Sequence, residues 1–192
     1  DHPGAVVTSV SAEPGALSER RGNVLLITIN RPDARNAVNQ AVSIGVGDAL
    51  QAAQDDPEIR AVVITGSGDK SFCAGADLKA LCAAALEPDL VKRWARIPEL
   101  VDIKAFITLM ALEQMLGHWD GYCLNRNNYR VYFDPASRKA IFMPHGMDQL
   151  FQDADASILD SPPAIVANAV MKNPAWRADY RKRVGELLPL FN

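Results

Sequence analysis

The chain has 192 residues, 48% of them apolar and 22% charged, which is the balance of an ordinary globular protein with enough apolar side chains for a core. The formal net charge of −3 argues against a nucleic-acid partner, because no basic stripe is available to displace counterions from phosphates. The cysteines Cys73, Cys82 and Cys123 show no C-x-x-C spacing, so we expect free thiols rather than a disulfide framework or a zinc site.

Two features of the sequence bear on location. The N-terminus lacks a basic segment followed by an apolar run, so we expect no signal peptide and a cytoplasmic protein. The most apolar stretch, residues 106–116, contains Glu113 and Gln114 and is far shorter than the roughly 20 apolar residues that span a bilayer. This stretch predicts a buried helix and no association with a membrane.

The first predicted elements form a strand–helix–strand pattern. Residues 24–29 and 61–65 are compact β-branched runs, and each predicts a buried strand. Between them, residues 39–54 have helical spacing, with Asn39 as the expected N-cap. The apolar side chains expected on one face of this helix are Val42, Val46, Leu50 and Ala53. The pattern predicts a βαβ unit with parallel strands and a right-handed crossover, preceded over residues 1–22 by a loose lead-in with at most one short strand.

After Leu81 the pattern becomes helical, with breaks expected at Pro88 and Pro98. Short strands over residues 129–133 and 140–143 flank a turn sequence and predict a β-hairpin.

Two helices are expected in the tail, over residues 163–172 and 174–188, the second capped by Asn173. The predicted fold is therefore mixed α/β, a parallel βαβ unit followed by a mostly helical part with one hairpin. We place the domains at residues 1–81 and 82–192, with the boundary inside a predicted helix, which is an unusual position for one.

The first candidate site follows the second strand, at residues 71–78. Small residues here let a ligand approach the backbone, and the first N–H groups of a helix lack internal partners and favour negative charge. Such donors can form one arm of an oxyanion hole. The alternative is a tight strand-to-helix turn with Asp77 in the first helical turn.

Residues 5–81, most clearly from residue 24, resemble the N-terminal part of the crotonase (enoyl-CoA hydratase/isomerase) family. The resemblance is carried by residues 30–37, 60–66 and 72–78. It implies a coenzyme A thioester bound along the loop after the first strand, and an Ala76 N–H that acts as a catalytic donor to the thioester oxygen. The residues that it implies for thioester binding are Asp33, Ala34, Arg35, Ala74, Gly75, Asp77, Leu78 and Lys79. The family's second oxyanion donor and its glutamates have no match after residue 82, so we expect no hydration.

The second candidate site surrounds the predicted hairpin. Asp120 and Asn125 are five residues apart, as are the aspartate and asparagine of a protein-kinase catalytic loop, and Asp148 follows the second hairpin strand. Phosphoryl transfer needs a carboxylate to orient the attacking hydroxyl, and an amide oxygen and a carboxylate to hold Mg²⁺. The alternative is that Asp120 and the neighbouring asparagines are turn formers, as Asp134 is expected to be.

From about residue 81 to the end, the chain resembles the C-terminal lobe of the spore-coat CotH family of atypical kinases, on residues 118–122, 125–129, 132, 134–135 and 144–149. The resemblance implies Mg²⁺ and ATP as cofactors. It also implies that Asp120 and Asp148 are the essential acids, with Asn125 or Asn128 joining Asp148 on the metal. The nucleotide-clamping lobe and its lysine have no counterpart here.

The two resemblances together predict a chimera, an acyl-CoA-binding fragment fused to a kinase catalytic lobe, with little or no turnover. Residual activity is expected as Mg²⁺–ATP binding or phosphotransfer. The alternative is acyl-CoA binding and crotonase-type chemistry completed by formation of a homo-oligomer. In either case the expected partner is a small molecule, a nucleotide or an acyl-CoA, and whether the chain is an enzyme at all is left open.

Overall fold

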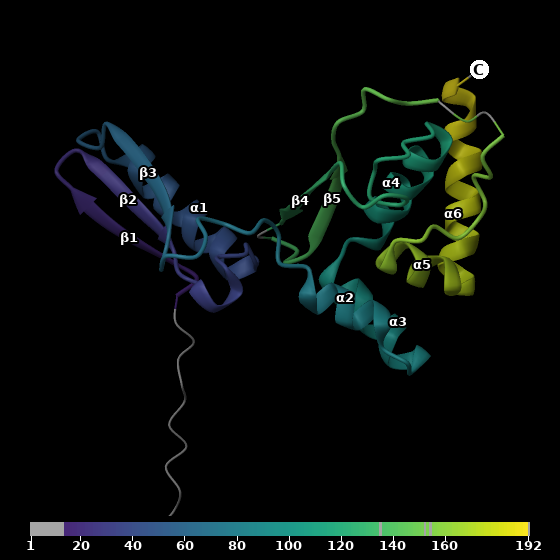
Figure 1. Cartoon of the computed structure of the whole chain (residues 1–192), viewed down its shortest axis with the longest axis horizontal. Coiled ribbons are helices and arrows are strands. Elements are labelled where there is room, and N and C mark those ends of the chain that lie inside the picture. Colours follow the sequence, from purple (N-terminus) through teal and green to yellow (C-terminus); the bar gives the residue numbers. More distant parts are fainter. Residues whose placement is uncertain (1–13, 135, 152, 154, 192) are drawn as a thin grey trace, which may run out of the picture. The chain divides into compact units, whose positions relative to one another are not determined.

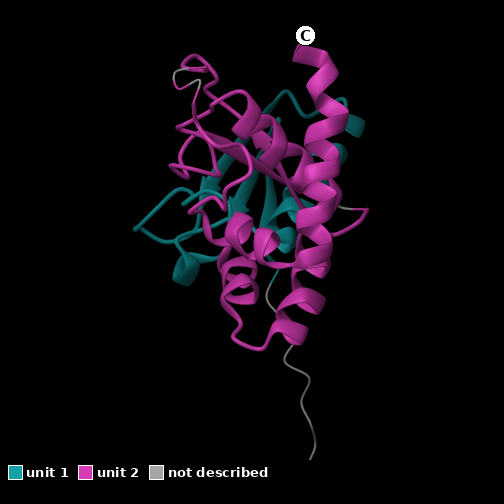
Figure 2. Cartoon of the chain, turned by 90° about the vertical axis from the view of Figure 1, so that its right-hand side faces the viewer, with its two compact units in different colours: residues 1–76 teal, residues 77–192 magenta. Residues whose placement is uncertain are grey.

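The computed structural model of the chain describes residues 14–134, 136–151, 153 and 155–191. The fold is mixed α/β, as predicted, and it divides into two compact units, residues 1–76 and residues 77–192 (Figures 1 and 2). Much of the predicted lead-in, residues 1–13, lies outside the described residues. The domain boundary predicted after residue 81 marks where one sequence resemblance ends and the other begins, and it stays a prediction.

The first unit is a three-stranded sheet with one helix packed on it (Figure 1). The sheet has the order β1 (Ala16–Arg21), β2 (Val24–Ile29) and β3 (Ala61–Gly66), with β1 antiparallel and β3 parallel to β2. Helix α1 (Gln40–Asp55) connects the two parallel strands and packs on β1 and β2. The predicted βαβ unit is confirmed, and β1 is the short strand expected in the lead-in.

Helix α1 begins at the predicted cap but presents a different face to the sheet. Oδ1 of Asn39 accepts a hydrogen bond from the Val42 N–H at 3.1 Å, which satisfies one of the free donors of the first turn. Val42 and Ala49 are buried, whereas Leu50 is 42% exposed, so its predicted place on the buried face is wrong. The reason lies at Gly45, where an added Cβ would stand 3.1 Å from Cβ of Ala16, so α1 approaches β1 along its small residues.

The prediction that residues 61–65 form a buried strand is right about the strand and wrong about its burial. Val62, Val63 and Ile64 are 37%, 48% and 40% exposed. A parallel strand is buried only where layers cover both of its faces, and β3 is an edge strand while α1 packs on β1 and β2. The buried apolar side chains of this sheet are Ile27 and Ile29 of β2.

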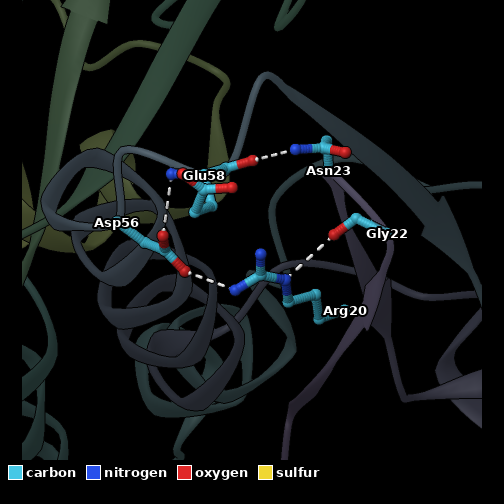
Figure 3. Close-up of polar contacts among 5 residues, drawn as sticks. All are labelled: Arg20, Gly22, Asn23, Asp56 and Glu58. Carbon is cyan, nitrogen blue, oxygen red and sulfur yellow. Dashed lines mark hydrogen bonds and ion pairs between the residues drawn. The ribbon is translucent and has the colours of Figure 1, made fainter.

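Polar contacts fasten the β1–β2 turn to the segment that follows α1 (Figure 3). Arg20 lies 2.8 Å from Oδ2 of Asp56 through its Nη1, and the Asn23 amide donates to the Glu58 carbonyl over 2.7 Å. The Arg20 side chain is half exposed, so the ion pair contributes about 1 kcal/mol or less. A backbone bond lies beside these contacts, in which the Arg60 N–H donates to the Asn23 carbonyl over 2.7 Å, next to the point where β2 and β3 begin to pair.

The second unit consists of five α-helices, a hairpin and a final 3-10 turn, counted over the described residues. The helices are α2 (Lys79–Leu86), α3 (Leu90–Leu100), α4 (Ile103–Met115), α5 (Ile165–Lys172) and α6 (Pro174–Leu187), with the 3-10 turn at Leu188–Phe191. The hairpin is β4 (Tyr129–Phe133) and β5 (Ala140–Pro144), paired antiparallel as predicted. Asn173 caps α6 as expected, accepting from the Ala175 and Trp176 N–H groups.

The helical stretch after residue 81 is interrupted at Pro88 as predicted, but the expected break at Pro98 is wrong. Helix α3 passes through Pro98 and ends at Leu100, where Val101 turns to extended backbone. Because Pro98 lies in the last turn, its missing N–H removes one helical hydrogen bond, and the Val101 N–H still donates to the Ile97 carbonyl at 3.1 Å.

Helix α4 is the centre of the core in this unit, as its apolar sequence predicts, and α6 packs along it (Figure 1). Among the described residues, no helix is both long and apolar enough to cross a membrane. One end of α4 carries an aromatic cluster in which neighbouring ring centroids lie 4.8 to 5.6 Å apart. Its members are Phe106, Tyr122, Tyr129 and Phe142. This cluster fixes the hairpin to the segment after α4.

Candidate functional site

In the first unit, one buried side chain ties together the loops that follow β2 and β3. The Asn36 amide nitrogen donates to the carbonyls of Ser71 at 2.7 Å and Ser67 at 2.9 Å. Its oxygen accepts from the Arg31 N–H at 3.0 Å and the Ser67 hydroxyl at 3.3 Å. Gly66 leaves room for this amide, since a Cβ there would stand 2.5 Å from Nδ2 of Asn36. Asn36 lies within the motif of residues 30–37, but nothing in the sequence indicated this role.

The predicted thioester-binding residues of the first unit lie in two segments. Asp33 and Ala34 form a 3-10 turn, Pro32–Ala34, and Arg35 follows it with a φ of 52°. Ala74 and Gly75 lie beyond β3, where the Val38 N–H donates to the Gly75 carbonyl at 2.8 Å. That bond belongs to a parallel bridge between Val38 and Ala76, which brings the two segments side by side.

Ala76 lies before helix α2 rather than in its first turn. The helix begins at Lys79, so the predicted gain from the helix dipole does not act on the Ala76 N–H. Ala76 is exposed, and its N–H donates no hydrogen bond to another described residue. Asp77, Leu78 and Lys79 belong to the second unit, where Oδ1 of Asp77 accepts from the Lys79 N–H at 3.2 Å. The oxyanion role of Ala76 stays a prediction.

In the second unit, the loop after α4 holds Asp120 in a ring of asparagine amides. Oδ1 accepts from Asn125 at 2.6 Å, and Oδ2 accepts from Asn128 at 2.8 Å and Asn127 at 2.9 Å. The hydrogen bonds from Asn125, and then from Asn127, lower the pKa of Asp120, because they stabilise its charged form. The carboxylate is therefore a fixed anion at neutral pH. Asn127 was considered only as a turn former, and its spacing from Asp120 gave no signal for this contact.

A cavity of about 220 Å³ brings the two predicted acids together. Asp120 enters it from the loop after α4, and Asp148 from the loop after β5. The lining residues are His118, Trp119, Asp120, Asn128, Gly146, Asp148 and Gln149. Of the two asparagines predicted as metal ligands, Asn128 lines the cavity, whereas Asn125 reaches the site through Asp120.

The loops on either side of the cavity are joined by polar contacts. Trp119 Nε1 donates to Oε1 of Gln149 at 3.2 Å, which links the residue before Asp120 to the residue after Asp148. The Asn128 amide also lies 3.5 Å from the Gly146 carbonyl. These contacts hold the two acids in one site although they are far apart in the chain.

The donor set of this cavity suits a hard cation that brings its own further ligands. Carboxylate and amide oxygens are the ligands that Mg²⁺ prefers, and Mg²⁺ is commonly held by one or two carboxylates together with water and phosphate. The described residues contain no group of three or more His, Cys, Asp or Glu side chains that could hold a metal ion. The two carboxylates and the one amide that line the cavity are a donor set compatible with Mg²⁺ that also has water or phosphate ligands.

Two other residues near the hairpin have local roles. The Asp134 carboxylate accepts from the N–H groups of Ser137 at 2.9 Å and Ala136 at 3.3 Å, as a turn residue does. The Ser137 contacts lower the pKa of Asp134. His145 lies 3.0 Å from Arg130 between Nε2 and Nη2.

Two protein families match the chain. Residues 19–103 match the family described as Enoyl-CoA hydratase/isomerase, and residues 76–192 match the family described as CotH kinase protein. The matched ranges overlap, so helices α2 and α3 fall within both.

The curated relatives resemble the N-terminal third of the chain. Probable enoyl-CoA hydratase EchA14 of Mycobacterium tuberculosis is 53% identical over 66 residues, which cover 34% of this chain and 25% of the relative. Crotonyl-CoA hydratase of Syntrophomonas wolfei is 47% identical over 60 residues, 31% of this chain and 23% of the relative. The chain spans about a quarter to a third of the curated relatives that it matches.

Solved structures match the same region. EchA1_1 from Mycobacterium paratuberculosis is 80% identical over 36% of this chain and 27% of its own, with a TM-score of 0.35. A carnitinyl-CoA dehydratase from Mycobacterium avium is 84% identical over 35% of this chain and 26% of its own, with a TM-score of 0.34. The N-terminal region is thus similar to enoyl-CoA hydratases, and the match over residues 76–192 takes in more than half of the chain.

Proposed function

Because the chain belongs to the CotH kinase protein family through residues 76–192, we propose that the cavity between Asp120 and Asp148 binds Mg²⁺ with the phosphates of ATP, with little or no turnover. The observation that carries the proposal is the cavity itself. It gathers two carboxylates and the Asn128 amide from three places in the chain.

The acids take different roles in this proposal. Asp148, with Asn128 or Asn125, holds Mg²⁺, and Asp120 orients the hydroxyl that would receive the phosphoryl group. The lowered pKa of Asp120 favours orientation over proton removal, because a strongly ionised carboxylate is a weak base. Bound Mg²⁺ would neutralise charge on the phosphates.

The size of the cavity points to recognition of phosphates rather than of a base. Pockets that enclose drug-sized ligands measure roughly 300 to 1,000 Å³. At about 220 Å³ this cavity is smaller than that range. We therefore expect the Mg²⁺ complexes of ATP, GTP and inorganic tripolyphosphate to bind with affinities within about threefold of one another.

Calorimetric titration with Mg²⁺–ATP tests the proposal. We expect weak but measurable binding by the full chain and a flat trace for Asp148→Ala. Asp134→Asn is the matched control, since Asp134 is a turn acid of the same hairpin and does not line the cavity. A flat trace for the unmodified chain would refute the proposal, as would unchanged binding by Asp148→Ala.

A second function, acyl-CoA binding, is favoured by the arrangement around Asn36 and by similarity to proteins named crotonyl-CoA hydratase and enoyl-CoA hydratase. In this proposal Asp33, Ala34 and Arg35 contact the coenzyme, and the exposed Ala76 N–H donates to the thioester oxygen. Ala74 to Lys79 contribute further contacts, and a homo-oligomer completes the site. No hydration is expected, because the glutamates have no match.

Titration with a short acyl-CoA tests this second proposal. The Ala76→Pro variant lacks the N–H and should lose binding, whereas Ala80→Ser, on the exposed surface of α2, should retain it. Equal binding by the unmodified chain and Ala76→Pro would count against the donor role. Detectable hydration of crotonyl-CoA by a pure sample would contradict the expectation that the missing glutamates abolish turnover.

A further inference from the structure

We propose that Glu113, a buried acid near the end of α4, is a positioning residue that holds Asp120 in the cavity. The inference deepens the proposed function and rests on it, since it assigns to Glu113 the placement of the acid that orients the hydroxyl. Glu113 does not itself line the cavity and is not one of the predicted metal ligands, so it is not a catalytic residue.

Glu113 holds the backbone on both sides of Asp120. Before Asp120, the His118 N–H donates to the Glu113 carbonyl at 2.8 Å. After Asp120, the Tyr122 N–H donates to Oε1 of Glu113 at 3.1 Å, and the Cys123 N–H donates to Oε2 at 2.8 Å. One residue thus bonds to the chain two positions before Asp120 and two and three positions after it.

The surroundings of this carboxylate are closely packed and shut off from solvent. Glu113 is 2% exposed and His118 is 1% exposed. Nδ1 of His118 lies 3.9 Å from Oε1 of Glu113. A Cβ on Gly121 would stand 2.7 Å from Nδ1 of His118 and 2.8 Å from Oε1 of Glu113, so the loop can pass here only as glycine. His118 in turn lines the cavity, so the buried pair lies next to the space that Asp120 enters.

A carboxylate is required because two N–H donors converge on it. Both of its oxygens accept, and hydrogen bonds to a charged acceptor are stronger than those between neutral groups. In Glu113→Gln, one oxygen is replaced by an NH₂ group that faces an N–H donor. The Tyr122 or the Cys123 N–H then loses its acceptor, and the loop must shift to find another.

The experiment uses the full chain and compares Glu113→Gln with Met110→Ala. Met110 is fully buried one turn earlier in α4, so we expect Met110→Ala to lower the melting temperature without removing a hydrogen-bond acceptor from the loop. We expect Glu113→Gln to weaken Mg²⁺–ATP binding at least tenfold, measured by calorimetry below the melting transition of both variants. Met110→Ala should stay within threefold of the unmodified chain. An affinity of Glu113→Gln within threefold of the unmodified chain would overturn the inference.

A second measurement separates this inference from the proposed function. The side-chain amide resonances of Asn125, Asn127 and Asn128 report on Asp120 without any ligand, because all three amides donate to its carboxylate. Glu113→Gln should shift these resonances, and Met110→Ala should not. Shifted resonances together with a flat titration of the unmodified chain would refute the proposed function and support the positioning of Asp120. Unchanged resonances would overturn the inference whatever the titration shows.

Discussion

The Asn128 side-chain amide donates to Oδ2 of Asp120 at 2.8 Å, and the Asn128 backbone N–H donates to the Asp120 carbonyl at 2.7 Å. The residue that precedes β4 therefore holds both the carboxylate and the backbone of the acid that follows α4. The hairpin and the helix both position the site, so a substitution in either element should change the position of the Asp120 carboxylate.

We expect Asp120 to titrate below the ordinary range of an aspartate. Its pKa is lowered chiefly by the Asn125 hydrogen bond, so Asn125→Ala should raise the midpoint and Asn127→Ala should raise it less. Because the folded-state pKa is the lower one, the associated stability is fully present above the unfolded-state pKa and is lost as the pH falls through the folded-state pKa. Carboxyl ¹³C chemical shifts followed from neutral pH into the acid range measure the midpoint. A midpoint that Asn125→Ala leaves in place would disprove the assignment.

We expect Asn36→Ala to destabilise the first unit by about 2 to 4 kcal/mol, because it leaves buried partners in two loops without hydrogen bonds. Asn23→Ala is the control, since the Asn23 amide makes one exposed bond, to Glu58, and its loss should cost about 1 kcal/mol or less. Urea unfolding, with hydrogen exchange of the β2 amides as the local readout, compares the two variants. Equal costs would show that the buried amide is not the main tie between the loops.

We expect Phe142→Ala to cost about 3 to 5 kcal/mol, since the ring is buried among Phe106, Tyr122 and Tyr129 and its loss leaves a cavity. Tyr132→Ala, on the other strand of the same hairpin, removes a ring that is 50% exposed and should cost about 1 kcal/mol or less. Urea unfolding followed by tryptophan fluorescence reports on the second unit, which contains all the tryptophans. A small loss for Phe142→Ala would mean that the aromatic cluster does not anchor the hairpin.

We expect the thiols to react with iodoacetamide in an order set by burial. Burial raises the pKa of the Cys123 thiol and, to a smaller extent, that of Cys82, and it also blocks access to Cys123, which is fully buried. Less thiolate is present at neutral pH when the pKa is raised, so Cys123 should react only after unfolding. Mass spectrometry of native and urea-treated samples gives the order. Modification of Cys123 in the native protein would contradict its place in the core.

The elements set by local chemistry could be predicted from the sequence. The cap at Asn39, the cap at Asn173 and the β4–β5 hairpin depend on neighbouring residues, and all are confirmed. The burial of β3 could not be predicted, because an apolar run indicates a strand but not whether a layer covers it. Leu50 was misplaced for a related reason, since only the packing of Gly45 on Ala16 shows which side of α1 meets the sheet.

For the candidate site, the two acids could be predicted from the sequence, but the residues that hold them in position could not. Asp120 and Asp148 meet in one cavity, as their places at the ends of predicted elements suggested. Glu113 was noticed only as a charge inside an apolar stretch. Its partners are the backbone N–H groups of Tyr122 and Cys123, which lie beyond a turn. Every residue except proline has a backbone N–H, so the sequence does not indicate which of them will bind a side chain.

The short connection between β1 and β2 has a consequence for the order in which the first unit assembles. Only Gly22 and Asn23 separate the two strands, and Gly22 has a φ of 62°. A hairpin with so short a loop closes in roughly 1 to 10 μs, well before distant segments meet. The pairing of β3 with β2 must close a much longer loop, because the whole of α1 lies between these two strands in the chain. We therefore expect β1 and β2 to form the folding nucleus of the unit, with the parallel pairing of β3 as its slow step.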